Sequence, residues 1–155
     1  MQVRLIAIGQ KMPAWVEEAY RDYSKRIKGD MRVELVALPM AKRSKNTSEE
    51  KMKAQEGKTL LNEIKPKDFV VALDVKGKAI STEALATQLT DWQQQGRSVA
   101  FFIGGPDGLS QEVINAADVK LSLSALTLPH PLVRVLVIEQ LYRAWSINHG
   151  HPYHR

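Results

Sequence analysis

The chain has no cysteine among its 155 residues. Disulfides, thiolate zinc sites and cysteine nucleophiles are therefore excluded. It also has no apolar run approaching the roughly 20 residues that a membrane-spanning helix needs. Residues 1–10 lack the apolar core and cleavage site of a secretory signal. We therefore expect a cytoplasmic protein with no membrane partner, folded as a single domain over residues 1–155.

Acidic residues are nearly absent from the last part of the chain, residues 128–155, where Glu139 is the only one. All four histidines of the protein lie in this stretch, together with several arginines. A segment rich in His, Tyr and Arg is suited to contact with an anion or to proton transfer. Its basic and titratable residues are His130, Arg134, Tyr142, Arg143, His149, His151, Tyr153, His154 and Arg155.

A second basic cluster, diluted by three glutamates, occupies residues 42–58. The net charge of +5 permits a nucleic-acid partner without establishing one. The cluster fits either a solvated loop and helix face or a binding surface, and the sequence leaves both open. Its cations are Lys42, Arg43, Lys45, Lys51, Lys53 and Lys58.

Apolar runs alternate with segments of helical periodicity along the chain. Because most of the runs are apolar throughout, we expect an α/β fold, with a mostly parallel sheet covered by helices on both faces. The expected strands are 3–9, 33–38, 69–74, 99–103 and 121–128, the last passing into a loop. The expected helices are 13–28, 47–64, one capped by Ser81, one capped by Ser110, and 131–147, with Thr47 and Glu50 forming a capping box.

Ligands of parallel sheets bind at the carboxyl ends of the strands. This rule selects three loops, which begin at Leu73, at Gly104 and at Ser124. The glycines of residues 104–108 would let the backbone approach a ligand closely, or would serve a tight turn with no ligand. Both interpretations stay open.

The final helix, residues 131–147, is apolar around nearly its whole circumference. Such a helix must be buried on every side. A domain of this size has difficulty enclosing a helix completely, so a subunit interface is a good alternative. A symmetric homodimer is the commonest arrangement of that kind.

His130 lies between Pro129 and Pro131, just before this helix. The prolines stiffen the loop, and a helix N-terminus disfavours a protonated imidazole. His130 could therefore accept a proton or bind a phosphate-bearing ligand, or it could be a structural histidine bonded to the backbone.

The last residues of the chain offer further candidates. Tyr153, His154 and Arg155 could stack on a base and bind phosphate, as in single-stranded RNA recognition, or could be a frayed end. The spacing of His149, His151 and His154 matches no standard zinc pattern, so no metal site is expected.

Five segments of the chain form a recognisable combination of motifs: Gly9–Pro13, Ile103–Ser110, Leu121–Arg134, Glu139–Ala144 and His151–Arg155. Together they resemble the ribosomal RNA large subunit methyltransferase H family, a small branch of the SPOUT class. The resemblance extends over the whole chain and is specific because the motifs occur in combination.

The resemblance implies a fold with a C-terminal trefoil knot, a homodimer, and S-adenosylmethionine as the methyl donor. It implies methylation of N3 of a pseudouridine in 23S rRNA of the assembled ribosome. No metal is implied. The cofactor site would consist of Leu73, Gly105, Ser124, Ala125, Leu126, Thr127, Leu128 and Pro129.

Catalysis then requires a group that takes the N3 proton or stabilises the resulting anion. His130, Tyr153 and His154 are the candidates. Arg143 and Arg155 would contact phosphate or the base anion, with Tyr153 and His154 also facing the substrate. The tail of one subunit could complete the pocket of the other, which would supply RNA-binding surface that the chain otherwise lacks.

Two other interpretations remain. One is a ribosome-associated RNA-binding factor without catalysis, and the other is an enzyme acting on small nucleotides. The motifs between residues 121 and 155 favour the methyltransferase.

Overall fold

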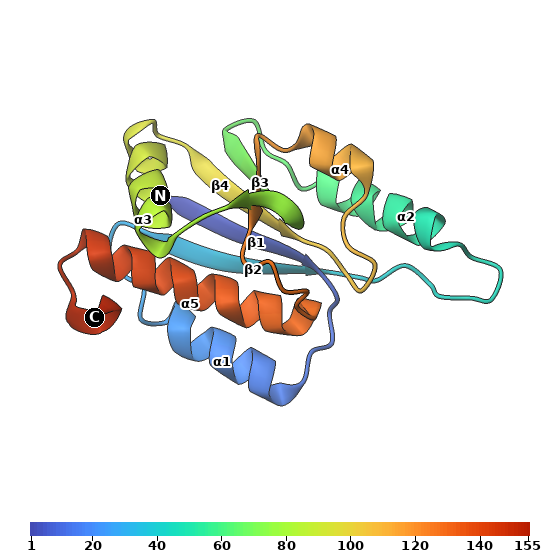
Figure 1. Cartoon of the computed structure of the whole chain (residues 1–155), viewed down its shortest axis with the longest axis horizontal. Helices are drawn as coiled ribbons and strands as arrows, with labels where there is room; N and C mark the ends of the chain where they lie inside the picture. Colours follow the sequence, from blue (N-terminus) through green and yellow to red (C-terminus); the bar gives the residue numbers. More distant parts are fainter.

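The computed structural model describes residues 1–155 and contains one sheet of five parallel strands, in the order β2-β1-β4-β3-β5. The predicted α/β fold with a parallel sheet is confirmed (Figure 1). The strands are β1 (Gln2–Ile8), β2 (Arg32–Leu38), β3 (Asp68–Ala79), β4 (Ser98–Ile103) and β5 (Val119–Ser122). The helices are α1 (Ala14–Ser24), α2 (Glu49–Leu61), α3 (Thr82–Gln94), α4 (Gln111–Ala116), α5 (His130–Asn148) and the 3-10 turn η1 (Pro152–His154).

Helices cover both faces of the sheet, as predicted. Helices α1, α3 and α5 lie on one face and α2 and α4 on the other (Figure 1). The core on the α5 side comprises 19 buried residues, against 7 on the other side, so α5 covers the main core. Residues 3–8 of β1 are buried on both faces, which explains the continuous apolar run of that strand.

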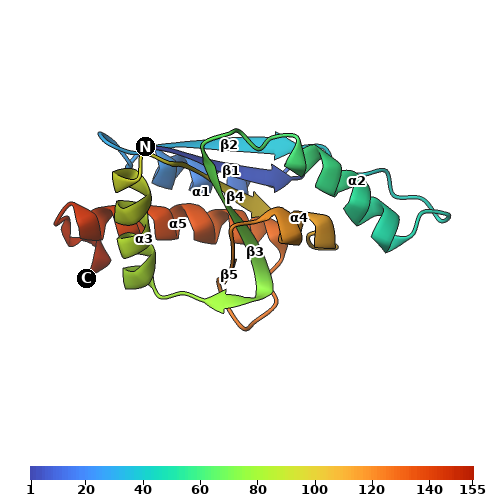
Figure 2. The ribbon, with the colours of Figure 1, turned by 90° about the horizontal axis from the view of Figure 1, so that it is seen from above.

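Helix α5 lies alongside β1, with its first turn at the carboxyl end of the strand and its last turn at the opposite edge of the sheet (Figure 1, Figure 2). Residues such as Val137, Ile138 and Leu141 of the helix are buried in the main core. The prediction of burial on every side is wrong for the single chain. Leu132, Val135 and Leu136, here called the α5 stripe, are only half-buried and do not belong to either core.

Strand β3 is longer than the apolar run that predicted it. It pairs with Leu121 of β5 at Leu73, departs for residues 74–77, and pairs with Leu121 again at Lys78. A Cβ at Gly77 would lie 2.8 Å from the backbone of Leu121, so only glycine fits this close approach. The prediction missed the extension because the extra residues are mostly polar and exposed.

The predicted fifth strand ends too late. Strand β5 stops at Ser122, where the side chain of Ser122 donates to the carbonyl of Ser124. The hydroxyl of Ser124 then accepts from the backbone N–H of Leu126. These local bonds turn the chain away from the sheet and make residues 123–129 a loop.

The cap of α2 differs from the predicted capping box. Ser48, not Thr47, is the N-cap, and its hydroxyl accepts from the backbone N–H of Lys51. Thr47 instead bonds Ser44, with their hydroxyl oxygens 2.6 Å apart. The helix ends at Leu61 rather than Ile64. The predicted caps of α3 and α4 are confirmed, since Ser81 and Ser110 each accept from the N–H three residues on.

The chain crosses from β5, at one edge of the sheet, back to β1, the second strand from the other edge. There the guanidinium of Arg134 donates to the carbonyls of Ile8 and Gly9, at 3.4 and 2.9 Å. The trefoil knot implied by the family resemblance stays a prediction. None of the helices combines the length and hydropathy required to cross a membrane.

Candidate active site

Three loops that the strand-end rule selected follow neighbouring strands. Strands β4, β3 and β5 are consecutive in the sheet, so their carboxyl ends share one edge. Leu73 lies half-buried where β3 leaves its first pairing with β5. Gly105 follows β4 and is buried, and residues 124–129 follow β5. The topology therefore brings the predicted cofactor residues to the same edge of the sheet.

Residues 104–108 form a tight turn. Gly105 and Gly108 form an isolated bridge, and the N–H of Gly108 donates to the carbonyl of Gly105 at 3.0 Å. A Cβ at Gly104 would lie 2.6 Å from the backbone of Gly108, and one at Gly105 would lie 3.1 Å from Ile8. The tight turn itself is confirmed. Whether the same backbone also contacts a ligand is not decided by the turn, and the contact stays a prediction.

The loop after β5 has free hydrogen-bonding groups. The backbone N–H groups of Ala125, Thr127 and Leu128 make no hydrogen bond, and Leu126 is 73% exposed. Ala125 and Thr127 are exposed, so water satisfies these groups in the free chain. Binding of a cofactor by this loop and Leu73 stays a prediction.

His130 is the first residue of α5 and adjoins this loop. Its ring lies close to Gly9 and Arg134. Its Nδ1 is buried without a partner, so Nε2 is the nitrogen available to a ligand. Burial, followed by the charges of Arg134 and Arg43, lowers the pKa of His130 below its usual range. The imidazole is therefore neutral at pH 7 and able to accept a proton.

Arg134 has a structural role that the sequence did not reveal. It was grouped with the basic residues of the C-terminal segment, but only 2% of it is exposed. Its bonds to Ile8 and Gly9 fasten the first turns of α5 to the end of β1. Burial lowers its pKa, and the charge of Tyr20 opposes that effect. Arg134 positions His130 and the preceding loop rather than facing solvent.

The C-terminal tail folds back on α5. The hydroxyl of Tyr153 donates to the Glu139 carboxylate at 3.2 Å, and Arg143 donates to the same oxygen at 2.6 and 2.9 Å. The guanidinium of Arg143 also lies 4.9 Å from the ring centre of Tyr153. Burial, with Tyr23 and Glu139 as further causes, raises the pKa of Tyr153. Tyr153 therefore stays protonated at neutral pH and is a poor proton acceptor in this arrangement.

The end of the chain is an ordered turn rather than a frayed end. The ring of Tyr153 packs on that of Tyr142 with centroids 4.5 Å apart. The Nδ1 of His154 lies 2.7 Å from the carbonyl of His151 and must be the donor, since a carbonyl only accepts. A neutral His154 therefore keeps an Nε2 lone pair. Arg155 is exposed.

The two groups of predicted catalytic residues do not meet in one chain. His130 begins α5, whereas Tyr153 contacts Glu139, nine residues along the helix. At 1.5 Å per residue this separation is about 14 Å along the helix axis. Arg143, His154 and Arg155 lie with Tyr153 on the far half of α5. The predicted catalytic residues of the single chain therefore form two separate groups, here called the two half-sites of the predicted active site.

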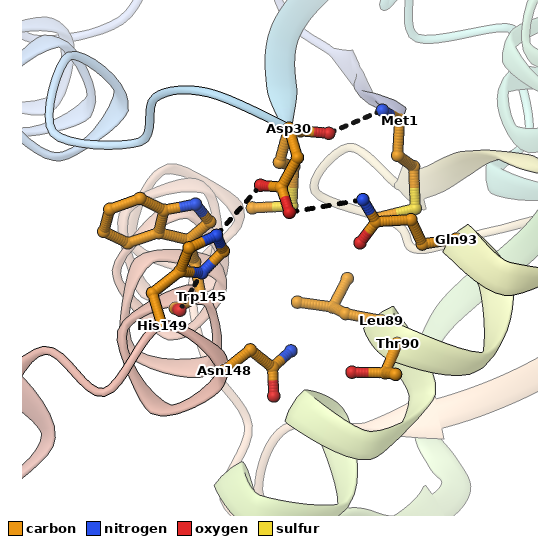
Figure 3. Close-up of a pocket in the computed structure, with 9 residues that line it drawn as sticks. Met1, Asp30, Leu89, Thr90, Gln93, Trp145, Asn148 and His149 are labelled. Atoms are coloured by element: carbon orange, nitrogen blue, oxygen red, sulfur yellow. Dashed lines mark hydrogen bonds and ion pairs between the residues drawn. The ribbon is translucent and has the colours of Figure 1, made fainter.

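His149 lines a cavity of about 220 Å³, together with Met1, Asp30 and Trp145 (Figure 3). Its Nε2 lies 3.1 Å from the Asp30 carboxylate and its Nδ1 lies 2.8 Å from the carbonyl of Trp145. The Nδ1 of His151 instead accepts from the backbone of Tyr153. The three tail histidines do not converge, and no group of three His, Asp or Glu residues is arranged to hold a metal.

The sequence was compared with known families and proteins. A family model described as "Predicted SPOUT methyltransferase" matches residues 1–154. A protein of Saccharophagus degradans named "Ribosomal RNA large subunit methyltransferase H" is 54% identical over 155 residues, all of both chains. A protein of the same name from Hahella chejuensis is 52% identical, covering all of this chain and 99% of that one.

Solved structures show a related fold at low sequence identity. A probable methylase family protein from Haemophilus influenzae aligns with a TM-score of 0.59 and 14% identity, over 96% of this chain and 66% of that one. A putative methylase family protein from Neisseria gonorrhoeae aligns with a TM-score of 0.52 and 15% identity, over 90% of this chain and 81% of that one.

Proposed function

Because the chain belongs to the SPOUT methyltransferase family, and is therefore a methyltransferase, we propose that its substrate is ribosomal RNA. The observation that carries this proposal is the match of the chain, over its full length, to proteins named as ribosomal RNA large subunit methyltransferases. The net charge of +5 is suited to an RNA partner.

The finer target follows from the motifs shared with that family. We propose methylation of N3 of a pseudouridine in 23S rRNA, within the assembled ribosome and hence in the cytoplasm. The base ring is small and would have to reach the carboxyl edge of the sheet, so we expect it to be unstacked from its RNA neighbours.

We propose S-adenosylmethionine as the methyl donor, since its positively charged sulfur supplies an already activated methyl group. Leu73 would pack against the adenosine. Gly105 would allow close approach of the backbone, and the unpaired groups of residues 124–129 would bond the adenine. The protein then contributes mainly orientation of the nucleophile against the methyl carbon.

A proton must leave N3 as the N–C bond forms. We propose His130 as the acceptor because it is neutral at pH 7 and adjoins residues 124–129. His154 is the alternative acceptor, with its free Nε2, whereas the protonated Tyr153 would have to release Glu139 before its hydroxyl could donate to the base. Arg155, which is exposed, and the free N–H groups of Arg143 would bind phosphate or the base anion.

We propose that two chains join their half-sites in a homodimer. The α5 stripe, together with Leu126, presents apolar side chains that the single chain leaves partly exposed. A two-fold axis perpendicular to α5 at the α5 stripe would set the two helices antiparallel, with the Glu139 level of one chain opposite the His130 end of the other. The tail of one chain would then reach the His130 end of the other.

The proposed reaction is tested with ribosomes that lack the modification. Labelled S-adenosylmethionine is supplied, and the modified nucleotide is mapped after digestion. Label at N3 of one pseudouridine of 23S rRNA is the expected result. Label on free nucleotides but not on ribosomes would instead favour the small-nucleotide enzyme, and absence of both label and cofactor binding would favour a non-catalytic RNA-binding protein.

A further inference from the structure

Glu56 of α2 is a buried carboxylate on the side of the helix that also carries the buried Gly57 and Leu60. Only 2% of the residue is exposed. One carboxylate oxygen accepts from the backbone N–H of Ala41 at 3.0 Å and lies 3.5 Å from the guanidinium of Arg43. The other oxygen has no partner and lies beside Gly105, 3.3 Å from where a Cβ of that residue would be. Burying a carboxylate is costly, so the contacts of Glu56 with Ala41 and Arg43 are needed to offset that cost.

Arg43 links this carboxylate to the glycine-rich turn. Its guanidinium lies 3.0 Å from the carboxylate of Asp107, within residues 104–108. The same side chain lies close enough to His130 to contribute to the lowered pKa of that group. The segment between β2 and α2, residues 40–47, is therefore fastened at the edge of the sheet that carries the predicted cofactor loops.

The fastened segment is strongly basic. Residues 39–48 contain Lys42, Arg43 and Lys45 and no acidic residue. Lys42 and Lys45 are exposed, and neither forms an ion pair. In two perpendicular views the segment projects beyond the carboxyl edge of the sheet (Figure 1, Figure 2). Two free ammonium groups are thus held beyond the carboxyl ends of the strands, on the β2 side of the sheet.

Given the proposed action on RNA, we propose that residues 40–47 are an RNA-docking surface, in which Lys42 and Lys45 contact phosphates and Arg43 and Glu56 are positioning residues. An ordinary solvated loop needs no buried carboxylate to hold it. A loop that must set the distance between an RNA backbone and a target base does need such an anchor. Arg43 forms ion pairs with Glu56 of α2 and with Asp107 of the glycine-rich turn, residues 104–108. These ion pairs fix the position of the docking surface relative to that turn.

The docking surface is tested with the double variant Lys42→Ala/Lys45→Ala in the full-length chain. The KM for ribosomes should rise about tenfold, and the salt dependence of log KM should become shallower by about 1 for each lysine. The kcat and the Kd for S-adenosylmethionine should stay unchanged. The matched control is Lys65→Ala/Lys67→Ala, which removes the same charge from two exposed lysines just before β3, at the opposite edge of the sheet.

A KM equal to that of the wild type, or an equal rise in the control, would overturn the docking surface. These outcomes differ from a failure of the proposed function. A wild-type chain that transfers no methyl group to ribosomes contradicts the proposed function, and the docking surface with it. An active wild type with an unaffected double variant contradicts the docking surface alone.

The positioning residues are tested separately, with Arg43→Ala and Arg43→Lys. The ribosome KM of Arg43→Ala should rise, and Lys42→Ala/Lys45→Ala should add little further loss, because the free lysines are no longer held in place. Arg43→Lys keeps the charge and should recover only part of the affinity, since it cannot bridge two carboxylates as a guanidinium does. A lower thermal midpoint with wild-type KM would show a merely structural role and overturn the assignment.

Discussion

Two buried polar atoms without partners belong to residues that lie close to Gly9, at the end of β1. They are the Nδ1 of His130 and the Nε of Arg134, and the hydroxyl of Tyr20 is a third such atom. Burial also raises the pKa of Tyr20. Each such atom normally costs about 1–3 kcal/mol, and native proteins keep few of them. Their presence next to the predicted cofactor loops is typical of a site whose polar groups await a ligand.

The lowered pKa of His130 gives a prediction for catalysis. If His130 accepts the N3 proton, the acid limb of the wild-type pH–rate profile should have an apparent pKa below 6.5, the usual value for histidine. His130→Ala should lose about 10²-fold or more in single-turnover rate, the usual contribution of a general base. The Kd for S-adenosylmethionine should change little. An acid limb that is the same in the variant would assign the proton to another group.

The same shift affects stability, with a definite sign. A folded-state pKa below the unfolded value means that protonation favours the unfolded chain. The contribution of a neutral His130 is therefore complete above pH 6.5 and is lost as the pH falls below that value. In urea titrations between pH 7.5 and 5, His130→Gln should lose less stability on acidification than the wild type. Parallel pH profiles would contradict the shift.

Some site residues were predictable from sequence and others were not. The strand-end rule placed Leu73, Gly105 and the loop from Ser124 at one edge because strand alternation is visible in a local pattern. Arg134 and Glu56 were missed, since their burial depends on partners far away in the chain, such as Gly9 and Ala41. A local pattern shows a charged residue but does not show what covers it.

At the scale of elements, two neighbouring hydroxyls at the N-terminus of α2 have different roles. Ser48 caps the helix, whereas Thr47 bonds only Ser44. Ser48→Ala should therefore lower the free energy of unfolding by about 1 kcal/mol, the usual cost of losing an N-cap. Thr47→Ala should cost clearly less. Urea denaturation of both variants measures the two changes in the free energy of unfolding. An equal decrease in the two variants would instead support the capping box predicted at Thr47.

Element types were predicted more accurately than element ends. Every predicted strand and helix exists in the structure. They could be predicted because the periodicity of apolar residues and the helix caps are local properties of the sequence. The ends of β3 and β5 were wrong because pairing decided them. Strand β3 continues through polar residues to pair a second time with Leu121, and β5 stops where Ser122 bonds the next turn. Strand pairing depends on residues that are far apart in the sequence, and a local sequence pattern does not include them.

At the scale of the whole molecule, the two half-sites on α5 give a test of the dimer. A variant lacking residues 151–155 has an intact cofactor loop, and Gly105→Val has an intact tail but a crowded turn. Neither should be active alone. Mixed in equal amounts, they should regain about a quarter of the wild-type activity, because half of the dimers contain one complete site.

As a control, the ratio of the two chains in the mixture is varied. The activity should be maximal when the two chains are present in about equal amounts. A mixture that regains no activity although mixed dimers form would refute the shared site. Activity in the variant lacking the tail alone would show that the tail is not required.

The position of α5 also has a consequence for the biosynthesis of the protein. The main core contains Val137, Ile138 and Leu141, and strands β1 and β4, far apart in sequence, pair at its centre. Because synthesis proceeds from the N-terminus, all five strands emerge from the ribosome before α5. Until α5 emerges, the face of the sheet that it covers is open to solvent, and the nascent chain depends on whatever shields that face from aggregation.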